Sequence, residues 1–462
     1  MPMLCIGILL AFYSHKALAF TEGNYTYTTN GAGQATMTGF NTYYYGDLSI
    51  TNVLGGFPLT AIESGAFAGC YNITSITIPA SIVTIGDDPF AWGGGPAMTN
   101  ITVDAANPAY ASAEGVLFDK NLTELIRYPS GKKGSAYTVP AGVVTLGTSA
   151  FVGNFNITAI VIPDSVSAIG EHAFSSCWYL SSVNIPDGIT RINASVFGAC
   201  SALTSLSIPD TVTYIGDGAF SGCAVLTSLN IPDGVTYIGA EAFNGVGLDS
   251  ITIPRGVTNI NNGTFSSCEN LTSINIPDNI TSIGAEAFSG SGLVSVTVPG
   301  SVTNIGNHAF ASCPELVSVS VPASVTAVGD FAFYDCAKLA SVLFGGDPPA
   351  LGGSDVFLYF FYPTVVYYLP GSSGWEATFG GCTTVCWNPT VRSAVFDGYS
   401  GQFGLTVSGN AGIPVVVEAT TNLTSGVWTF LTNSTLGASG SLHFSDPSSP
   451  IPPSRFYRIA FP

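Results

Sequence analysis

The stretch Ser201-Ala-Leu-Thr-Ser-Leu-Ser-Ile-Pro-Asp-Thr-Val-Thr-Tyr-Ile-Gly-Asp-Gly-Ala-Phe-Ser-Gly-Cys223 recurs in close copies along most of this chain. The spacing is 23 residues from Phe174 to Phe197 and again to Phe220, and two later copies are one residue shorter. The phenylalanines that mark the copies are Phe151, Phe174, Phe197, Phe220, Phe243, Phe265, Phe288, Phe310 and Phe333. A period of this size is typical of a solenoid, in which each copy forms one turn of a coil.

Each position of the copy has a physical interpretation. Leu203, Leu206 and Ile208 form the L-x-x-L-x-I core of a leucine-rich repeat. They lie on a short strand whose alternate residues point inward. Pro209 ends that strand because it has no N–H for the ladder. The residues from Pro209 to Phe220 are expected to form a short helical or 3₁₀ turn. The sequence predicts a mainly β leucine-rich repeat solenoid with a parallel sheet on its concave face.

A glycine column accompanies the repeat. The residue after the inward aliphatic position is Gly86, Gly147, Gly170, Gly216, Gly239, Gly284, Gly306 or Gly329, and Asn193 or Asn261 in the remaining copies. Glycine and asparagine tolerate positive φ better than other residues. We therefore expect a left-handed corner at this position in every turn.

Composition limits the classes of partner. The 462 residues include 11 Lys and Arg against 29 Asp and Glu, a net charge of −18, so we expect neither nucleic-acid binding nor attraction to anionic membranes.

An apolar run from Met3 to Tyr13 followed by Ala17-Leu18-Ala19 predicts a secretory signal peptide, residues 1–19. The alternative is a buried N-terminal strand, since no Lys or Arg precedes the run. The run is too short to span a membrane, so the protein is expected to be secreted or at the cell surface.

Seven of the ten cysteines follow the repeat phenylalanine by three residues. They form a column rather than pairs, and we interpret them as free, buried thiols that pack inside the coil. The column members are Cys70, Cys177, Cys200, Cys223, Cys268, Cys313 and Cys336. Cys382 and Cys386 lie outside the repeats, and the sequence leaves open whether they form a disulfide.

Changes of pattern divide the chain into segments. We expect an N-terminal cap at 20–61, the solenoid at 62–345 with a hairpin insertion at 105–137, a C-terminal cap at 346–389 and a small β-sandwich-like module at 390–462. The module contains five short predicted strands, near 403–408, 414–420, 427–431, 441–444 and 455–459. Insertions of this kind carry function or are tolerated decorations, and the sequence favours neither.

The repeat A-F-x-x-C-x-x-L-x-S-I-x-I-P-x-x-V-T-x-I-G, together with the insertion N-P-x-Y…G-V-L-F-D-K…T-E-L-I-R-Y-P, resembles the BspA-like (Treponema pallidum type) leucine-rich repeat family over about residues 60 to 345. That family occurs on secreted or surface proteins, several of them associated with adhesion. The resemblance implies a binding scaffold and supplies no catalytic residue.

Small polar residues recur on the outward side of the predicted strand. Their uncharged groups predict a binding face with weak, extended or multivalent contacts, because Trp, Tyr and Arg, which dominate strong interfaces, are nearly absent. Hydrogen bonding between neighbouring hydroxyls explains the same pattern. The candidate residues are Ser182, Asn184, Ser205, Ser207, Ser228, Asn230, Ser250, Thr252, Ser273 and Asn275.

A carboxylate column follows the strand proline. Stacked Asp side chains could hold Ca²⁺ through their oxygens, or each could accept a backbone N–H in its own turn; we favour the second reading and expect no metal or cofactor. The column is Asp164, Asp187, Asp210 and Asp233, then Asp278 after Arg255. The four histidines are too scattered for a catalytic or zinc site, so we expect no enzyme.

Two functional hypotheses remain. The first is an exported, non-enzymatic binding or adhesion protein whose leucine-rich repeat surface contacts an extracellular or cell-surface protein. The second is a glycan-binding or cell-envelope structural protein in which the C-terminal β module binds and the solenoid is a spacer.

Overall fold

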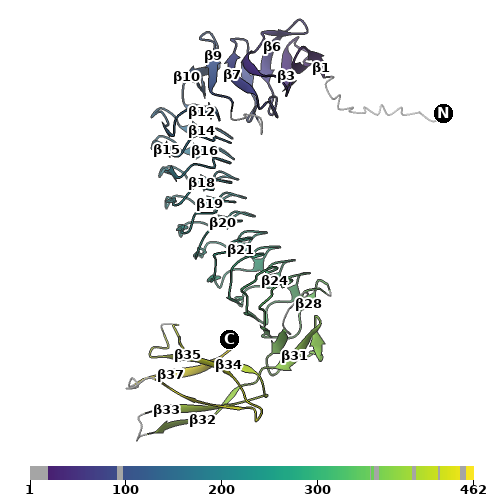
Figure 1. Ribbon diagram of the computed structural model, residues 1–462, viewed down its shortest axis with the longest axis vertical. Coiled ribbons are helices and arrows are strands. Elements are labelled where there is room, and N and C mark those ends of the chain that lie inside the picture. Colours follow the sequence, from purple (N-terminus) through teal and green to yellow (C-terminus); the bar gives the residue numbers. More distant parts are fainter. Residues whose placement is uncertain are drawn as a thin grey trace, which may run out of the picture. The chain divides into compact units, whose positions relative to one another are not determined.

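The computed structural model describes residues 19–90, 97–353, 355–357, 364–397, 402–424, 427–447 and 454–461. Every regular element among these residues is a β-strand (Figure 1). The chain forms two compact units, Met1–Leu180 and Ser181–Pro462. The predicted signal peptide, residues 1–19, lies outside the described residues apart from Ala19.

The first unit contains sixteen strands in the described ranges. They are β1 Phe20–Glu22, β2 Tyr25–Thr29, β3 Ala35–Phe40, β4 Gly46–Ser49, β5 Val53–Leu54, β6 Phe57–Ile62, β7 Ile73–Ile78, β8 Thr84–Ile85, β9 Asn100–Val103, β10 Tyr110–Ala113, β11 Val116–Asp119, β12 Glu124–Arg127, β13 Ala136–Thr138, β14 Thr145–Leu146, β15 Ala159–Val161 and β16 Ala168–Ile169. The region expected to be a cap already joins the coil, because β4 pairs in parallel with β7 and Phe40 packs on Phe67.

The second unit contains the remaining strands of the described residues. They are β17 Ser182–Val183, β18 Arg191–Ile192, β19 Tyr214–Ile215, β20 Tyr237–Ile238, β21 Asn259–Ile260, β22 Ser282–Ile283, β23 Ser295–Thr297, β24 Asn304–Ile305, β25 Ser318–Val321, β26 Ala327–Val328, β27 Ser341–Phe344, β28 Ala350–Leu351, β29 Val365–Tyr368, β30 Thr378–Phe379, β31 Cys382–Cys386, β32 Thr390–Asp397, β33 Gln402–Ser408, β34 Pro414–Thr420, β35 Thr429–Thr435, β36 Ser441–Ser445 and β37 Phe456–Ala460.

A column of stacked phenylalanine rings runs through the interior of the coil. From Phe197 to Phe357 the ring centroids of successive turns are 5.3 to 5.6 Å apart and the rings are nearly parallel. The repeat phenylalanines are fully buried, and burial of each contributes about 1.5–3 kcal/mol. In the first unit Tyr128 takes the equivalent place beneath Phe151. The repeat period therefore predicts this column correctly.

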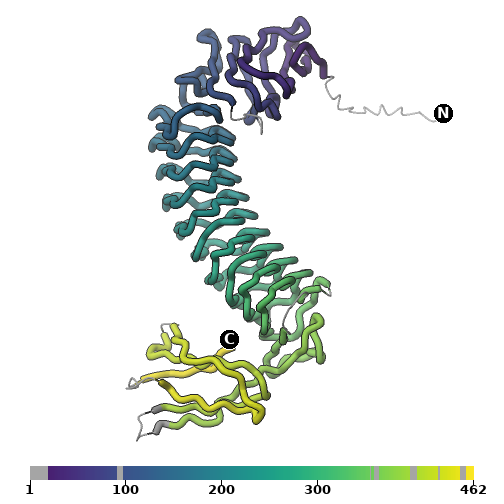
Figure 2. The backbone as a smooth tube through the Cα atoms, in the orientation of Figure 1, coloured from purple at the N-terminus to yellow at the C-terminus, as the bar shows by residue number. Residues whose placement is uncertain are grey.

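Figure 2 shows the backbone of successive turns stacked along the coil. Backbone hydrogen bonds join these turns on two sides of the phenylalanine column. On one side short parallel strands pair, as in β18–β19–β20 and β21–β22–β24–β26–β28. On the other, the N–H of each phenylalanine donates to the next turn, for example Phe220 N to Ala242 O at 2.8 Å. Each turn is thus held to its neighbours at two separate places.

The glycine column has a different role from the predicted one. None of these eight glycines has a positive φ. Instead, a Cβ added at Gly216 would lie 2.7 Å from Ala194 N in the preceding turn, closer than real Cβ contacts. Glycine is needed because the two backbones touch. In the copy that carries Asn261, its side-chain amide donates to Ile238 O at 2.6 Å, replacing the bond that Gly239 N makes to Ile215 O.

The residue with left-handed backbone lies two positions after the glycine column. Its occupants are varied, and most of them carry a side chain: Ser149, His172, Ser195, Gly218, Glu241, Gly263, Glu286, His308 and Phe331. The expected short helical turns are single turns closed by i+3 to i hydrogen bonds, such as Ser221 N to Gly218 O at 3.0 Å. The prediction of a left-handed residue is confirmed for the nine turns from Ser149 to Phe331, but its position was wrong, and in the turn that carries Gly86 the equivalent residue, Asp88, has no positive φ.

The cysteine column adds a third link between turns. All nine cysteines of the described residues are free. The Cys223 thiol donates to Phe197 O at 3.2 Å and the Cys268 thiol to Phe243 O at 3.1 Å, each in the preceding turn. Burial raises the pKa of both thiols to about 12, so they stay protonated as donors at neutral pH. Cys382 and Cys386 lie four residues apart on one strand, β31, and are unpaired.

Beyond Phe344 the coil continues instead of ending. Strand β28 pairs with β26, Phe357 stacks on Phe333, and β29 and β31 extend the ladder that starts at β23. The C-terminal module consists of two three-stranded antiparallel sheets, β32–β33–β36 and β35–β34–β37, with Leu405, Val417 and Phe444 packed between them. Five of its strands lie where the sequence predicts them, and β32 is additional.

The module and the last turns of the coil share a hydrophobic core. Leu343 and Tyr367 of the coil pack in one cluster with Val407, Ile413 and Val415 of the module. Trp387, at the junction, donates from Nε1 to Pro414 O at 2.7 Å. The junction near residue 389 is therefore a packed interface within this unit.

Replacing Gly216 by Ala should lower the melting temperature, because the new methyl group must push apart two backbones that touch. Overpacking of this kind typically costs about 1–3 kcal/mol. Gly300→Ala is the matched control, since a Cβ there meets nothing within 4 Å. Thermal unfolding followed by circular dichroism compares the two variants, and equal melting temperatures would contradict the close-contact role.

Candidate functional site

The candidate site lies on the outward face of the L-x-x-L-x-I segments. We call it the serine face and define it by Ser182, Asn184, Ser205, Ser207, Ser228, Asn230, Ser250, Thr252, Ser273 and Asn275. All ten side chains are exposed and all lie in the second unit. The structure thus places the sequence-predicted residues on one surface.

The strand ladder beneath this face is open in the central turns. From β23 onward the segments pair in parallel as β23–β25–β27–β29–β31. Between Asn184 and Val294 the segments on this side form no ladder: neighbouring segments share one strand bridge, Thr252 to Asn275, and single backbone hydrogen bonds such as Asp249 N to Thr227 O at 3.2 Å. No hydrogen bond involves the backbone of Ser205 to Ser207 or of Ser228 to Asn230. The predicted continuous sheet is therefore interrupted where the polar face is most regular.

The sequence offers a physical reason for the interruption. The paired segments centre on β-branched Val296, Val319 and Val342, whereas two of the open ones centre on Leu206 and Leu229, which favour strands less. The other two open segments centre on β-branched Ile251 and Ile274, and these two share the single bridge. The opening also exposes apolar surface: Leu206 is half-buried, while Val319 is completely buried. The hydrogen bonds on the other sides of the coil keep these turns stacked without a ladder here.

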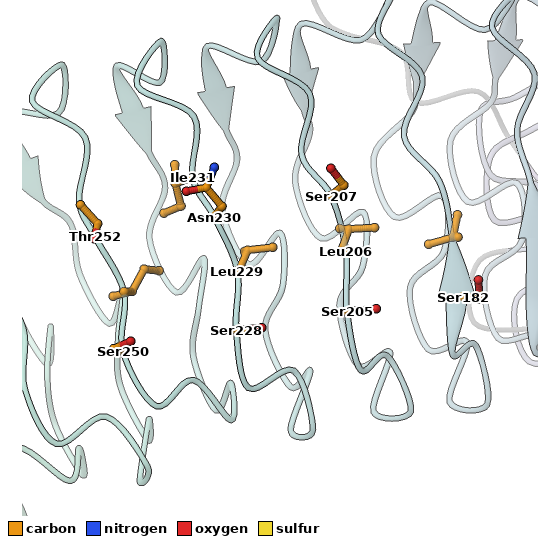
Figure 3. A pocket seen from close by; sticks show the side chains of 12 residues that line it. Ser182, Ser205, Leu206, Ser207, Ser228, Leu229, Asn230, Ile231, Ser250 and Thr252 are labelled. Carbon is orange, nitrogen blue, oxygen red and sulfur yellow. The ribbon is translucent and has the colours of Figure 1, made fainter.

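A groove of about 640 Å³ lies along the open segments (Figure 3). It is lined by Ser182, Val183, Ser205, Leu206, Ser207, Ser228, Leu229, Asn230, Ile231, Ser250, Ile251 and Thr252. None of the hydroxyl and amide side chains in this lining makes a hydrogen bond to protein. The alternative explanation of the serines, bonding between neighbouring hydroxyls, is wrong for these turns.

Two further hollows adjoin the groove. One, of about 310 Å³, shares Asn230 and reaches Asp210 and Asp233. The other, of about 780 Å³, shares Thr252 and extends along Arg255 to Asn275 and Asp278. Of the ten predicted residues, Asn184 and Ser273 lie on the face but outside these linings. The site is a long polar depression with mostly acidic residues on one border.

The aspartate column forms that acidic border. Asp187, Asp210 and Asp233 are exposed, and their carboxylates take part in no hydrogen bond, so the expectation that each accepts a backbone N–H in its own turn was wrong. Within the part of the chain that the structure describes, no group of three or more His, Cys, Asp or Glu is arranged to hold a metal ion. The column, Asp164 included, is therefore a row of exposed carboxylates on the surface of the coil.

The inserted hairpin is present, with β11 and β12 paired antiparallel and a further strand, β10, beside β11. Its Arg127 is buried: Nη1 donates to Ser149 O at 2.7 Å and the guanidinium lies 5.5 Å from the centre of the Phe90 ring. Burial lowers the pKa of Arg127 to about 10, and nearby Asp88 partly opposes that shift. This charge anchors the hairpin to the coil.

Sequence reasoning missed an aromatic stack on the opposite ladder. The Arg191 guanidinium lies 3.6 Å from the centre of the Tyr214 ring, which stacks on Tyr237 at 4.8 Å. Partial burial and the carboxylate of Asp217 raise the pKa of Tyr237. The 23-residue spacing could have predicted this stack, because Arg191, Tyr214 and Tyr237 occupy one repeat position in consecutive copies.

The model of the BspA type leucine-rich repeat region matches residues 36–107, 131–249 and 236–354, in six copies. The chain belongs to this family. The match covers more than half of the sequence and extends at both ends beyond the predicted solenoid, in agreement with the stacked turns seen at Phe40 and at Leu351.

Several solved structures resemble this BspA-type chain. A leucine rich cell surface protein from Faecalibacterium prausnitzii is 25% identical, with 72% of this chain and 96% of that chain covered and a TM-score of 0.45. A leucine-rich repeat protein from Bacteroides ovatus is 23% identical, with 76% and 99% covered and a TM-score of 0.39. The T. pallidum leucine-rich repeat protein is 27% identical, with 45% and 86% covered and a TM-score of 0.34.

No curated protein is significantly similar to the sequence. Among the described residues, no helix is long and apolar enough to cross a membrane.

Removing divalent cations should leave the melting temperature of this BspA-type protein unchanged. The aspartate column consists of exposed carboxylates, and among the described residues no three or more acidic, His or Cys side chains are grouped to hold an ion. Differential scanning calorimetry with and without excess EDTA measures the effect. A fall of several degrees that added Ca²⁺ reverses would contradict this assignment.

Proposed function

We propose that this chain is an exported, non-enzymatic binding protein that contacts an extracellular or cell-surface protein through the serine face. The observation that carries the proposal is the groove of about 640 Å³, whose hydroxyl and amide groups have no partner within the protein. Membership of the BspA-type family supports a role in binding.

The chemistry of the groove favours an extended ligand. The backbone groups of the open segments from Ser205 to Ser207 and from Ser228 to Asn230 are free to bond with a partner backbone, and the hydroxyls beside them both donate and accept. Because the lining has no Trp, Tyr or Arg, each contact is expected to be weak. Affinity then comes from many turns acting together.

Export is part of the proposal. It is supported by the apolar run at Met3 to Tyr13 and the Ala17-Leu18-Ala19 pattern. The column of buried cysteines is compatible with an oxidising compartment, because the thiols are packed inside separate turns and bonded to carbonyl groups.

The double variant Ser205→Arg/Ser228→Arg should abolish binding to extracellular partners, because two long charged side chains would fill the groove. The full chain is tested by surface plasmon resonance on a panel of purified extracellular-matrix proteins. Thr236→Arg, an exposed substitution at a position outside the groove lining, is the control and should bind like wild type. Wild-type binding to none of the panel, or undiminished binding by the double variant, would refute the proposal.

Expression of the full gene in a bacterial host should yield a mature protein that begins at Phe20. Cleavage after Ala19 follows from the small residues at Ala17 and Ala19. Sequencing of the N-terminus of the protein recovered outside the cytoplasm provides the test. Recovery only in the cytoplasm, with Met1 retained, contradicts export.

A further inference from the structure

The outer face of one sheet in the C-terminal module carries exposed aromatic rings. Strand β34 is the middle strand, and Glu418 lies opposite Phe430 of β35 and opposite Arg458 of β37. Because residues two apart on a strand share a face, Phe456 lies on the same side as Arg458. These side chains come from three strands and from distant parts of the sequence, so no repeat or motif predicts that they lie together.

The exposed residues are arranged around a single ion pair. Arg458 Nε donates to Glu418 Oε2 at 2.6 Å, and the guanidinium lies 4.5 Å from the centre of the Trp428 ring. Phe430 is 58% exposed and Phe456 is 41% exposed. We call this surface the aromatic plate and define it by Trp428, Phe430, Phe456, Arg458 and Glu418. A hollow of about 410 Å³ adjoins it and is lined in part by Trp428, Phe456 and Arg458.

The aromatic plate is not needed to hold the module together. The inner face of the same sheet supplies the core through Val417, Ala419 and Tyr457, and the Tyr457 ring stacks on Phe403 at 4.3 Å. Tyr457 also donates its hydroxyl to the buried Asp446 at 2.6 Å. Large apolar side chains left exposed together beside a core that is complete without them indicate an interaction surface.

We propose that the aromatic plate binds the sugar rings of a neutral polysaccharide. The two charges of the plate pair with each other. Arg455, which lines the adjoining hollow, pairs with the buried Asp446 at 3.1 Å, so these groups leave no net charge to attract a charged ligand. Aromatic rings fit the apolar C–H faces of sugars, while the Arg458 and Glu418 side chains offer donors and an acceptor to sugar hydroxyls. Five side chains match one or two sugar rings, whereas a stable protein interface uses roughly 20–30 residues a side.

The proposal is tested with the full chain by affinity electrophoresis through gels containing β-glucan, xylan, galactomannan or starch, with alginate as an acidic comparison. At least one neutral polysaccharide should retard the wild-type protein, and alginate should not. Phe430→Ala/Phe456→Ala should weaken the retardation at least tenfold. Val395→Ala, which removes an equally exposed apolar side chain from β32 in the other sheet, should leave it unchanged.

The variants also separate this site from the serine face. Ser205→Arg/Ser228→Arg should retain polysaccharide binding, so loss of one activity leaves the other measurable. Absence of retardation by every neutral polysaccharide, or an equal loss in Val395→Ala, overturns the proposal. So does sedimentation in which wild type is a dimer and Phe430→Ala/Phe456→Ala a monomer, since the plate would then pair two copies of this chain.

Discussion

Close contact between the backbones of successive turns is the constraint on which the rest of the structure depends. At Gly216 the backbones of two successive turns approach so closely that no side chain fits between them. That approach allows the Ile215 ladder to form and places the phenylalanine rings at stacking distance. Because each turn is thin and contacts only its neighbours, stability accumulates along the coil rather than around one central core.

The same contact explains how one side of the coil can remain open. Turns that are hydrogen-bonded at the glycine column and at the phenylalanine corner stay stacked even where the third side has no ladder. The open side exposes backbone and hydroxyl groups at Ser205 and Ser228 that a regular sheet would satisfy internally. The fold does not need those groups for its own hydrogen bonds, so they are available to the proposed partner. The C-terminal module adds a second, chemically different surface at the aromatic plate.

Most of what could be predicted from the sequence is periodic, although the stack of Arg191, Tyr214 and Tyr237 was missed despite its regular spacing. The 23-residue spacing is enough to place Phe197 above Phe220 and to predict that the serine-face positions are exposed on successive turns. It could not assign the glycines, because glycine is required both for positive φ and for close backbone approach, and Gly216 needs only the second. The turn at Phe357 was missed because its copy has lost the leucine pattern. The aromatic plate depends on the register of Glu418 with Phe430 and Arg458, which only the folded sheet reveals.

The central claim is that the turns are bonded together on the glycine side and open on the serine side. Hydrogen–deuterium exchange of the full chain, resolved to single amides, measures this directly. The account predicts slow exchange for the amides of Gly216 and Gly239, and fast exchange for those of Ser205, Ser207, Ser228 and Asn230. Equal protection of the two groups would mean that the serine face is a closed sheet, and would contradict the account.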